Sequence, residues 1–153
     1  MERSALPNDF KEFLNLLNRH EVRYMVVGGY AVGYHGYPRT TNDLDVWVAA
    51  DQKNIAGLLI ALNAFGFSDP AMQQWAQSPR KTLRMGYPPV QIEVLTQISG
   101  VEFEQAHARR IEASFDDVSV FVISIGDLRA NKRAAGRAKD QDDLLNLPKS
   151  DEK

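Results

Sequence analysis

Apolar residues recur along this chain at two different spacings, and these spacings predict helices interspersed with strands. Helical spacing predicts a helix around residues 10–17 and an amphipathic helix from 51 to 66, capped by Asp51 and closed by Gly66. Further helices are predicted at 30–35, 102–110, 125–135 and 140–147. Short apolar or alternating runs predict strands at 23–28, 43–49, 82–85, 90–95 and 117–123. Between them, residues 69–79 are predicted to form a polar connection in which Met72 and Trp75 anchor a single helical turn.

This mixture predicts an α+β (mixed α/β) fold, a small mixed sheet flanked by helices. The turn residues Gly86-Tyr87-Pro88-Pro89 join two of the strands as a hairpin. A chain of 153 residues suits one domain. We place that domain at residues 1–147 and expect a frayed tail at 148–153.

Composition narrows the class of protein. The apolar share of 44% and the charged share of 25% are typical of a soluble globular protein, and the net charge of −2 argues against a surface built to attract DNA. The absence of cysteine excludes disulfides and thiolate catalysis. No signal peptide is evident at the start, and no apolar run approaches the ~20 residues of a membrane span. We therefore expect a cytoplasmic protein that does not bind membranes.

Two carboxylates in the predicted strand 43–49 carry the strongest chemical signal. Asp43 and Asp45 are two residues apart, so in a strand they project from the same face while Leu44 and Val46 point the other way. Adjacent anions repel unless a cation lies between them. A hard divalent ion that prefers oxygen ligands, such as Mg²⁺, is the expected partner.

Glu93 supplies a third carboxylate in the strand 90–95, where Ile92 and Val94 occupy the other face. Adjacent strands lie about 4.8 Å apart, so Glu93 can join Asp43 and Asp45 in one metal cluster. Phosphoryl-transfer sites often hold two metals bridged by carboxylates. In the alternative interpretation, Glu93 faces water on an exposed side of an antiparallel sheet.

A glycine pair, Gly28-Gly29, follows the apolar run 24–27 and opens a short helix, an arrangement that lets backbone N–H groups approach phosphates. A tight structural turn is the alternative. Gly-Gly at a strand-to-helix turn, then Asp43-Leu44-Asp45-Val46 and a carboxylate on a later strand, resembles the DNA polymerase β-type nucleotidyltransferase superfamily. The closest resemblance is to AbiEii-like proteins and to the aminoglycoside and lincosamide nucleotidyltransferases. The motifs span about residues 23–147.

The resemblance implies an Mg²⁺-dependent enzyme that moves a nucleoside monophosphate from an NTP to a hydroxyl acceptor, possible acceptors being a small molecule, a protein or RNA. It implies that Asp43, Asp45 and Glu93 are the catalytic and metal-binding residues. Six residues are implied to bind the nucleotide: Gly28, Gly29, Arg39, Thr40, Thr41 and Lys132. A structural role for Arg39 as an exposed loop residue, or for Lys132 on a solvated helix face, stays open. Asp140 is implied to belong to the same site.

The sequence also leads to expectations about the acceptor site, the biological setting and alternative functions. Because many relatives carry a further helical domain for the acceptor, the site is expected to be completed by a partner protein or a second copy of the chain. A toxin–antitoxin or resistance-type system is the setting implied by the resemblance. The alternative function is a catalytically degenerate, antitoxin-like binding module that acts through a partner protein. A nucleic-acid binder that uses the basic segment 129–139 is the third possibility.

Overall fold

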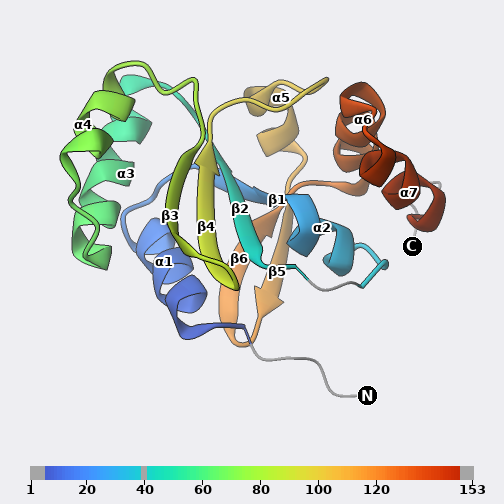
Figure 1. The fold of residues 1–153 in the computed structure, drawn as a ribbon, viewed down its shortest axis with the longest axis horizontal. Coiled ribbons are helices and arrows are strands. Elements are labelled where there is room, and N and C mark those ends of the chain that lie inside the picture. The colour runs from blue at the N-terminus through green and yellow to red at the C-terminus, as the bar shows by residue number, and fades with distance from the viewer. Residues whose placement is uncertain (1–5, 39–40, 149–153) are drawn as a thin grey trace.

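The computed structural model describes residues 6–38 and 41–148 of the chain. Figure 1 shows its helices and strands. The helices are α1 (Asn8–Arg19), α2 (Gly28–Tyr34), α3 (Gln52–Phe65), α4 (Pro70–Gln77), α5 (Phe103–Ala108), α6 (Ile125–Ala135) and α7 (Ala138–Asn146). The strands are β1 (Tyr24–Val27), β2 (Asp43–Val48), β3 (Leu83–Tyr87), β4 (Val90–Leu95), β5 (Ile111–Phe115) and β6 (Val118–Val122).

The strands form one mixed sheet in the order β3-β4-β2-β1-β6-β5. Three pairs are antiparallel, namely β1 with β2, β3 with β4 and β5 with β6. Two pairs are parallel, β1 with β6 and β2 with β4. Strand β2 therefore lies between β1 and β4, which places its side chains beside those of both neighbours near the middle of the sheet.

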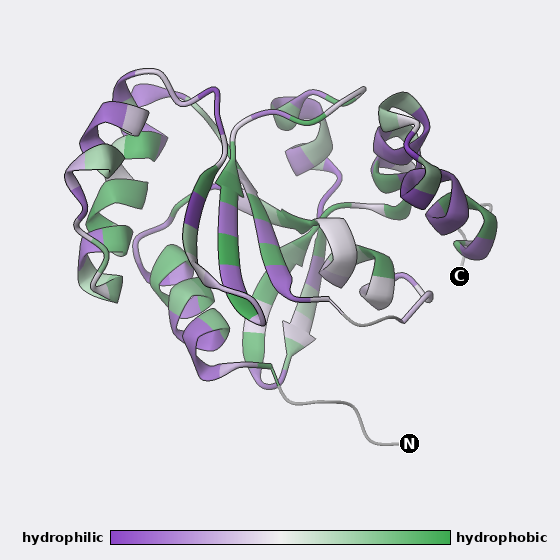
Figure 2. Cartoon of the chain, viewed as in Figure 1, coloured by the Kyte–Doolittle hydropathy of each residue, from purple (hydrophilic) through white to green (hydrophobic). Residues whose placement is uncertain are grey.

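Alternation along the strands separates a core face from a polar face. Leu44, Val46 and Val48 of β2 are fully buried, and the buried Ile92 and Val94 of β4 pair beside Leu44 and Val46. The apolar side of α1 is buried at helical spacing, and α1 packs against α3. Figure 2 shows the alternation as hydrophilic and hydrophobic bands across the strands. The same strands thus supply both a hydrophobic core and a row of polar positions.

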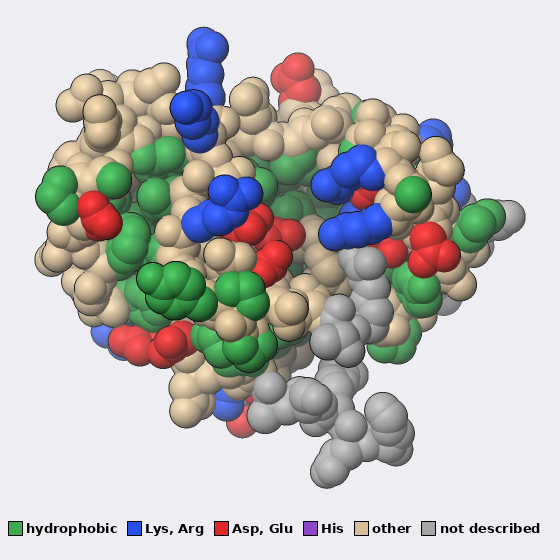
Figure 3. Space-filling model, viewed as in Figure 1, with side chains coloured by type: hydrophobic (Ala, Val, Ile, Leu, Met, Phe, Trp, Pro, Cys, Tyr) green, Lys and Arg blue, Asp and Glu red, His purple; other side chains and the backbone are tan. Residues whose placement is uncertain are grey.

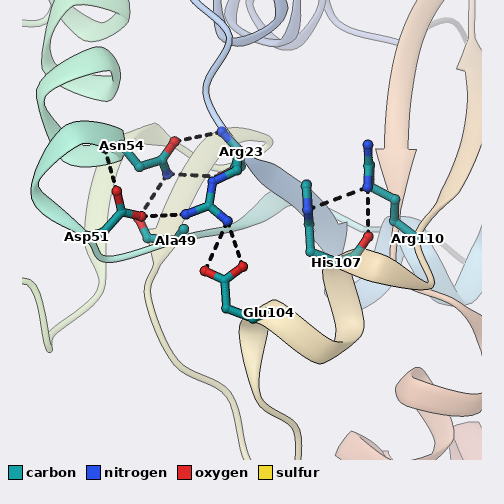
Figure 4. A network of polar contacts seen from close by, with 7 residues as sticks. All are labelled: Arg23, Ala49, Asp51, Asn54, Glu104, His107 and Arg110. Atoms are coloured by element: carbon teal, nitrogen blue, oxygen red, sulfur yellow. Dashed lines mark hydrogen bonds and ion pairs between the residues drawn. The ribbon is translucent and has the colours of Figure 1, made fainter.

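Contacts of Arg23, just before β1, and of its partner Asn54 link four elements (Figure 4). Its guanidinium pairs with Asp51 at 2.5 Å and with Glu104 of α5 at 2.7 Å. Asn54 of α3 accepts from the Arg23 backbone N–H at 2.7 Å, and its amide donates to the carbonyl of Ala49 at 2.9 Å. These contacts fix the start of β1 against the end of β2, the start of α3, and α5.

The predicted α+β class is correct, and most predicted elements are present. The main differences concern β5, α4 and the start of α2. The strand β5 was not predicted, since its exposed and half-buried residues alternate at a sheet edge. Residues 69–79 hold the full helix α4, which Asp69 caps by accepting from the Ala71 N–H, with Pro70 in its first turn. Helix α2 begins at Gly28, so the glycine pair lies in its first turn.

Helix α7 begins at Ala138, two residues before the predicted start. Among the described residues, no helix combines the length and the apolar character needed to cross a membrane. Of the predicted tail at 148–153, only residue 148 is among the described residues.

Candidate active site

Three carboxylates meet on the polar face where β2 lies beside β4. The parallel register places Asp45 directly beside Glu93, and Asp43 lies two residues earlier on β2. One oxygen from each of the three carboxylates lies within 4.8 Å of the others. The expected proximity of Asp43, Asp45 and Glu93 is therefore present in the structure. We call these three residues the acidic cluster.

The acidic cluster lies on an open face between basic groups. In Figure 3, acidic side chains gather over the middle of the sheet, and Lys and Arg side chains flank them on two sides. On one side is Arg84 of β3, the cross-strand neighbour of Glu93, whose Nε lies 3.1 Å from Glu93 Oε2. Lys139 and Arg137, at the start of α7, interact electrostatically with Asp45. The cluster therefore sits where a polyanion can be held from both sides.

The carboxyl of Asp45 is strongly affected by its surroundings. Burial and the negative charges of Glu93 and Asp43 raise the pKa of Asp45 to about 7, whereas Lys139 acts in the opposite direction. Its Oδ1 atom is buried and has no hydrogen-bond partner among the described residues. A buried carboxylate oxygen without a donor is costly unless a cation or a proton satisfies it.

Gly28 leaves room for the carboxylate of Asp45. Residue 28 adopts φ +69°, and a β-carbon there would lie 2.0 Å from Asp45 Oδ2. Val27, the residue before it, pairs directly with Asp45 across β1 and β2. The first glycine of the pair is therefore required both by its backbone conformation and by the close approach of a carboxylate.

Gly29 makes room for Thr41, because a β-carbon on Gly29 would lie 2.8 Å from Thr41 Oγ1. The Thr41 hydroxyl donates to the Asp43 carbonyl at 3.2 Å and accepts from the Asp43 N–H at 3.4 Å. These contacts place Thr41 at the entry to β2, next to the acidic cluster. Arg39 and Thr40, also predicted to bind nucleotide, lie outside the described residues.

Lys132 lies away from the surface of the site. Its side chain is 4% exposed, and its Nζ lies 3.2 Å from Asp140 Oδ1 and 3.1 Å from Asp143 Oδ2. Both aspartates are fully buried, and Arg137 also pairs with Asp140 at 2.7 Å. The structure thus places Lys132 and Asp140 together, within the contact between α6 and α7. A nucleotide contact by Lys132 stays a prediction.

Two other residues of suitable chemistry for substrate contact, Trp47 and His35, have partners within the protein. Trp47 shares the face of Asp45 but is 1% exposed and packs edge-on against Phe103. Its burial leaves no surface on which a base can stack. His35 is hydrogen-bonded through Nε2 to the Ile123 carbonyl at 2.7 Å.

Sequence reasoning did not identify Arg84, Arg137 or Lys139 as residues of this site. Arg84 had a usable signal, because a hairpin turning at 86–89 brings position 84 opposite position 93. The spacing of Arg137 and Lys139 in the sequence gives no such signal, because their approach to Asp45 depends on how α6 and α7 pack beside the sheet.

The acidic cluster fits a divalent metal ion. Its donor set consists of carboxylate oxygens, which Mg²⁺ and Mn²⁺ prefer. The unpartnered Oδ1 of Asp45 and the mutual repulsion of three clustered acids are the features that such an ion relieves. Asp43, Asp45 and Glu93 are the residues that would hold it.

Solved structures share this fold at low sequence identity. One is the lincosamide antibiotic adenylyltransferase LnuA in its lincomycin-bound form, with TM-score 0.57 and 13% identity over 95% of this chain and 98% of that one. Another is an antigenic nucleotidyltransferase-like protein from Paracoccidioides brasiliensis, with TM-score 0.51 and 17% identity over 94% of this chain and 77% of that one. These similarities show a nucleotidyltransferase fold.

A search of curated proteins found no match. A family model does match, over residues 5–148, which include the glycine pair, the acidic cluster and the α6–α7 segment. The chain therefore belongs to the family described as nucleotidyltransferase of unknown function (DUF6036).

Proposed function

We propose that this protein is a metal-dependent nucleotidyltransferase that transfers a nucleoside monophosphate from an NTP to a hydroxyl group. The acidic cluster carries the proposal, because three carboxylates converge within 4.8 Å beside a glycine that makes room for one of them. The family and the shared fold support nucleotidyl transfer as the class of reaction. We also propose that the metal is Mg²⁺ and that the donor is an NTP.

Asp43 and Asp45 are the proposed metal ligands, and Glu93 is the proposed third ligand or base. A bound divalent ion supplies charge neutralisation for the triphosphate and lowers the pKa of a coordinated hydroxyl. In the reaction, the acceptor oxygen bonds to the α-phosphorus, the bond from that phosphorus to the bridging oxygen breaks, and pyrophosphate leaves. The acceptor proton passes to a carboxylate, and Glu93 is the proposed base because it lies beside Asp45.

The first turn of α2 is the proposed position of the triphosphate. Gly28 and Gly29 have no side chains to keep phosphate oxygens from the backbone N–H groups next to the acidic cluster. Thr41, packed on Gly29, lines the same entry to β2. Arg39 is retained as a proposed phosphate ligand because it precedes this entry in the sequence.

The acceptor is proposed as a hydroxyl compound, a small molecule, a protein side chain or an RNA end. LnuA, whose structure holds lincomycin, provides one example of the fold with a small-molecule ligand. A resistance-type or toxin–antitoxin setting is part of the proposal. In either setting a partner protein or a second copy of the chain is proposed to complete the acceptor site.

Calorimetric titration of ATP, GTP, CTP and UTP, each with and without Mg²⁺, tests the proposal. Wild type is expected to bind at least one triphosphate only when Mg²⁺ is present, and Asp45→Asn is expected to lose that binding by at least tenfold. Glu12→Gln, which alters an exposed acid on α1, is the matched control. Equal nucleotide binding by wild type and Asp45→Asn would contradict the proposed metal site, and no binding at all would favour a module that acts through a partner protein.

A further inference from the structure

A buried ion-pair cluster holds α7 against α6. Lys132 projects from α6, and Asp140 and Asp143 lie three residues apart on α7, so both carboxylates fall on the same helix face. The Lys132 ammonium is 3.1–3.2 Å from an oxygen of each. Both carboxylates are fully buried, and this ammonium is the positive charge that they share, while Asp140 also pairs with Arg137.

The buried ion pairs of Lys132 also fix the position of the first turn of α7. Gly136, at φ +66°, ends α6 and turns the chain, and Arg137 is the N-cap of α7. The backbone N–H of Arg137 donates to Asp140 Oδ2 at 3.1 Å, and its Nε donates to the same atom at 2.7 Å. Asp140 is therefore held by Lys132 from inside the protein and by Arg137 from outside.

Lys139, in the first turn of α7, is the basic residue there that is exposed and can contact a ligand. It is exposed, adjoins the anchored Asp140, and makes no ion pair with any described residue. The hydroxyl of Tyr37, just after α2, donates to Asp142 Oδ2 of α7 at 2.9 Å, so α7 lies beside the helix whose first turn adjoins Asp45. The electrostatic interaction of Lys139 with Asp45 is consistent with this placement. Lys132, by contrast, is enclosed and has both of its acidic partners within the protein.

We propose that Lys132 is a positioning residue: it anchors α7 through Asp140 and Asp143 so that Lys139 meets the triphosphate, and it makes no contact with the nucleotide itself. The inference rests on the proposed function for the identity of the ligand. It assigns the phosphate contact to Lys139, seven residues further along the chain than the lysine that motif spacing indicates.

Inorganic tripolyphosphate with Mg²⁺ is the probe, because its binding does not depend on the base. Lys139→Met is expected to weaken tripolyphosphate binding about tenfold with an unchanged Tm, whereas Lys53→Met, at an exposed position of α3, changes neither. Lys132→Met is expected to lower the Tm by about 10 °C, because it removes the ammonium that both buried carboxylates contact. The deciding variant is Lys132→Met combined with Asp143→Asn, which removes one charge of each sign and leaves Asp140 paired with Arg137.

A positioning role predicts that this double variant regains most of the lost Tm and binds tripolyphosphate within about threefold of wild type. A double variant that folds like wild type but binds tenfold or more weakly would show that Lys132 contacts phosphate directly, and would overturn the inference. An unchanged Tm in Lys132→Met would also overturn it.

Mn²⁺ binding, followed by electron paramagnetic resonance without any phosphate, separates this inference from the proposed function. Suppose that wild type binds Mn²⁺, that Asp45→Asn does not, and that wild type fails to bind tripolyphosphate. This result supports the metal site but overturns the assignment of Lys139. Absence of Mn²⁺ binding by wild type contradicts the proposed function itself.

Discussion

Gly28 and Asp45 lie so close together that a β-carbon on residue 28 would come within 2.0 Å of Asp45 Oδ2. The two residues belong to adjacent elements, since Val27 at the end of β1 pairs with Asp45 on β2. The contact shows that the glycine is part of the construction of the acidic cluster as well as a turn residue. Any side chain at position 28 must displace the carboxylate.

Gly28→Ala is therefore expected to disturb metal binding and stability together. The displaced carboxylate weakens Mn²⁺ affinity by at least tenfold, and the positive φ costs about 1–2 kcal/mol of unfolding free energy. Gly33→Ala, in the same helix, is the matched control because a β-carbon there meets nothing within 4 Å. It is expected to leave Mn²⁺ affinity unchanged and to add up to about 1 kcal/mol of stability. Wild-type Mn²⁺ affinity in Gly28→Ala would show that the metal site does not depend on the close approach of Gly28 to Asp45.

Asp45→Asn is expected to stabilise the metal-free protein at alkaline pH. The pKa of Asp45 in the folded state is raised to about 7 from an ordinary value of 3.8, so between these values the folded state binds the proton more tightly than the unfolded state. Stability contributed by the protonated carboxyl is therefore present at low pH and is lost as pH rises toward 7. At pH 8 the asparagine variant avoids the buried charge and gains on the order of 2 kcal/mol.

Urea unfolding in EDTA at pH 5 and pH 8 measures this effect. The gain from Asp45→Asn is expected to be larger at pH 8 than at pH 5, and Glu12→Gln is expected to show no such difference. Mg²⁺ is expected to raise the Tm of wild type but not of the variant, because only wild type binds the ion in its folded state. A variant less stable than wild type at both pH values would argue against a costly buried charge.

The architecture and the acidic cluster were accessible from sequence because they depend on local patterns. Alternation along β2 and β4 places Asp45 and Glu93 away from the apolar face, and the remaining question was whether the two strands are neighbours. The edge strand β5 was missed because its burial alternates only between half-buried and exposed positions. Its strand structure depends on pairing with β6, a tertiary effect.

The basic side of the site was harder to predict because charge alone does not reveal burial. Lys132 and Lys139 have the same chemistry in the sequence, but one is enclosed by two aspartates and the other is exposed. The difference depends on the packing of α6 against α7. The resemblance implies that Asp140 belongs to the nucleotide site, whereas in the structure Asp140 and the neighbouring Asp143 are both fully buried.

Asp140→Asn is expected to destabilise the protein at neutral pH but not in strong acid. Arg137 and Lys132 outweigh the effect of burial and lower the pKa of Asp140 to about 2. With a depressed folded-state pKa, the stabilisation is present above pH 4 and is lost as pH falls toward 2. The variant is expected to lose about 2 kcal/mol at pH 7. Urea unfolding between pH 7 and pH 2.5 checks this, with Asp142→Asn, at an exposed position of α7, as the control; a loss independent of pH would point to packing rather than charge.

Arg84→Gln is expected to tighten metal binding. In the structure the Arg84 guanidinium lies 3.1 Å from Glu93 Oε2 and neutralises a carboxylate that the metal needs. The Arg84 side chain is 62% exposed, so its competition with the ion is modest and a gain of about threefold in Mn²⁺ affinity is expected. The gain is expected to shrink in 0.5 M KCl, because salt screens an exposed pair. Lys81→Gln removes an exposed positive charge shortly before β3 and serves as the control for net charge. Weaker Mn²⁺ binding in Arg84→Gln than in Lys81→Gln would mean that Arg84 supports the geometry of Glu93 instead of competing for it.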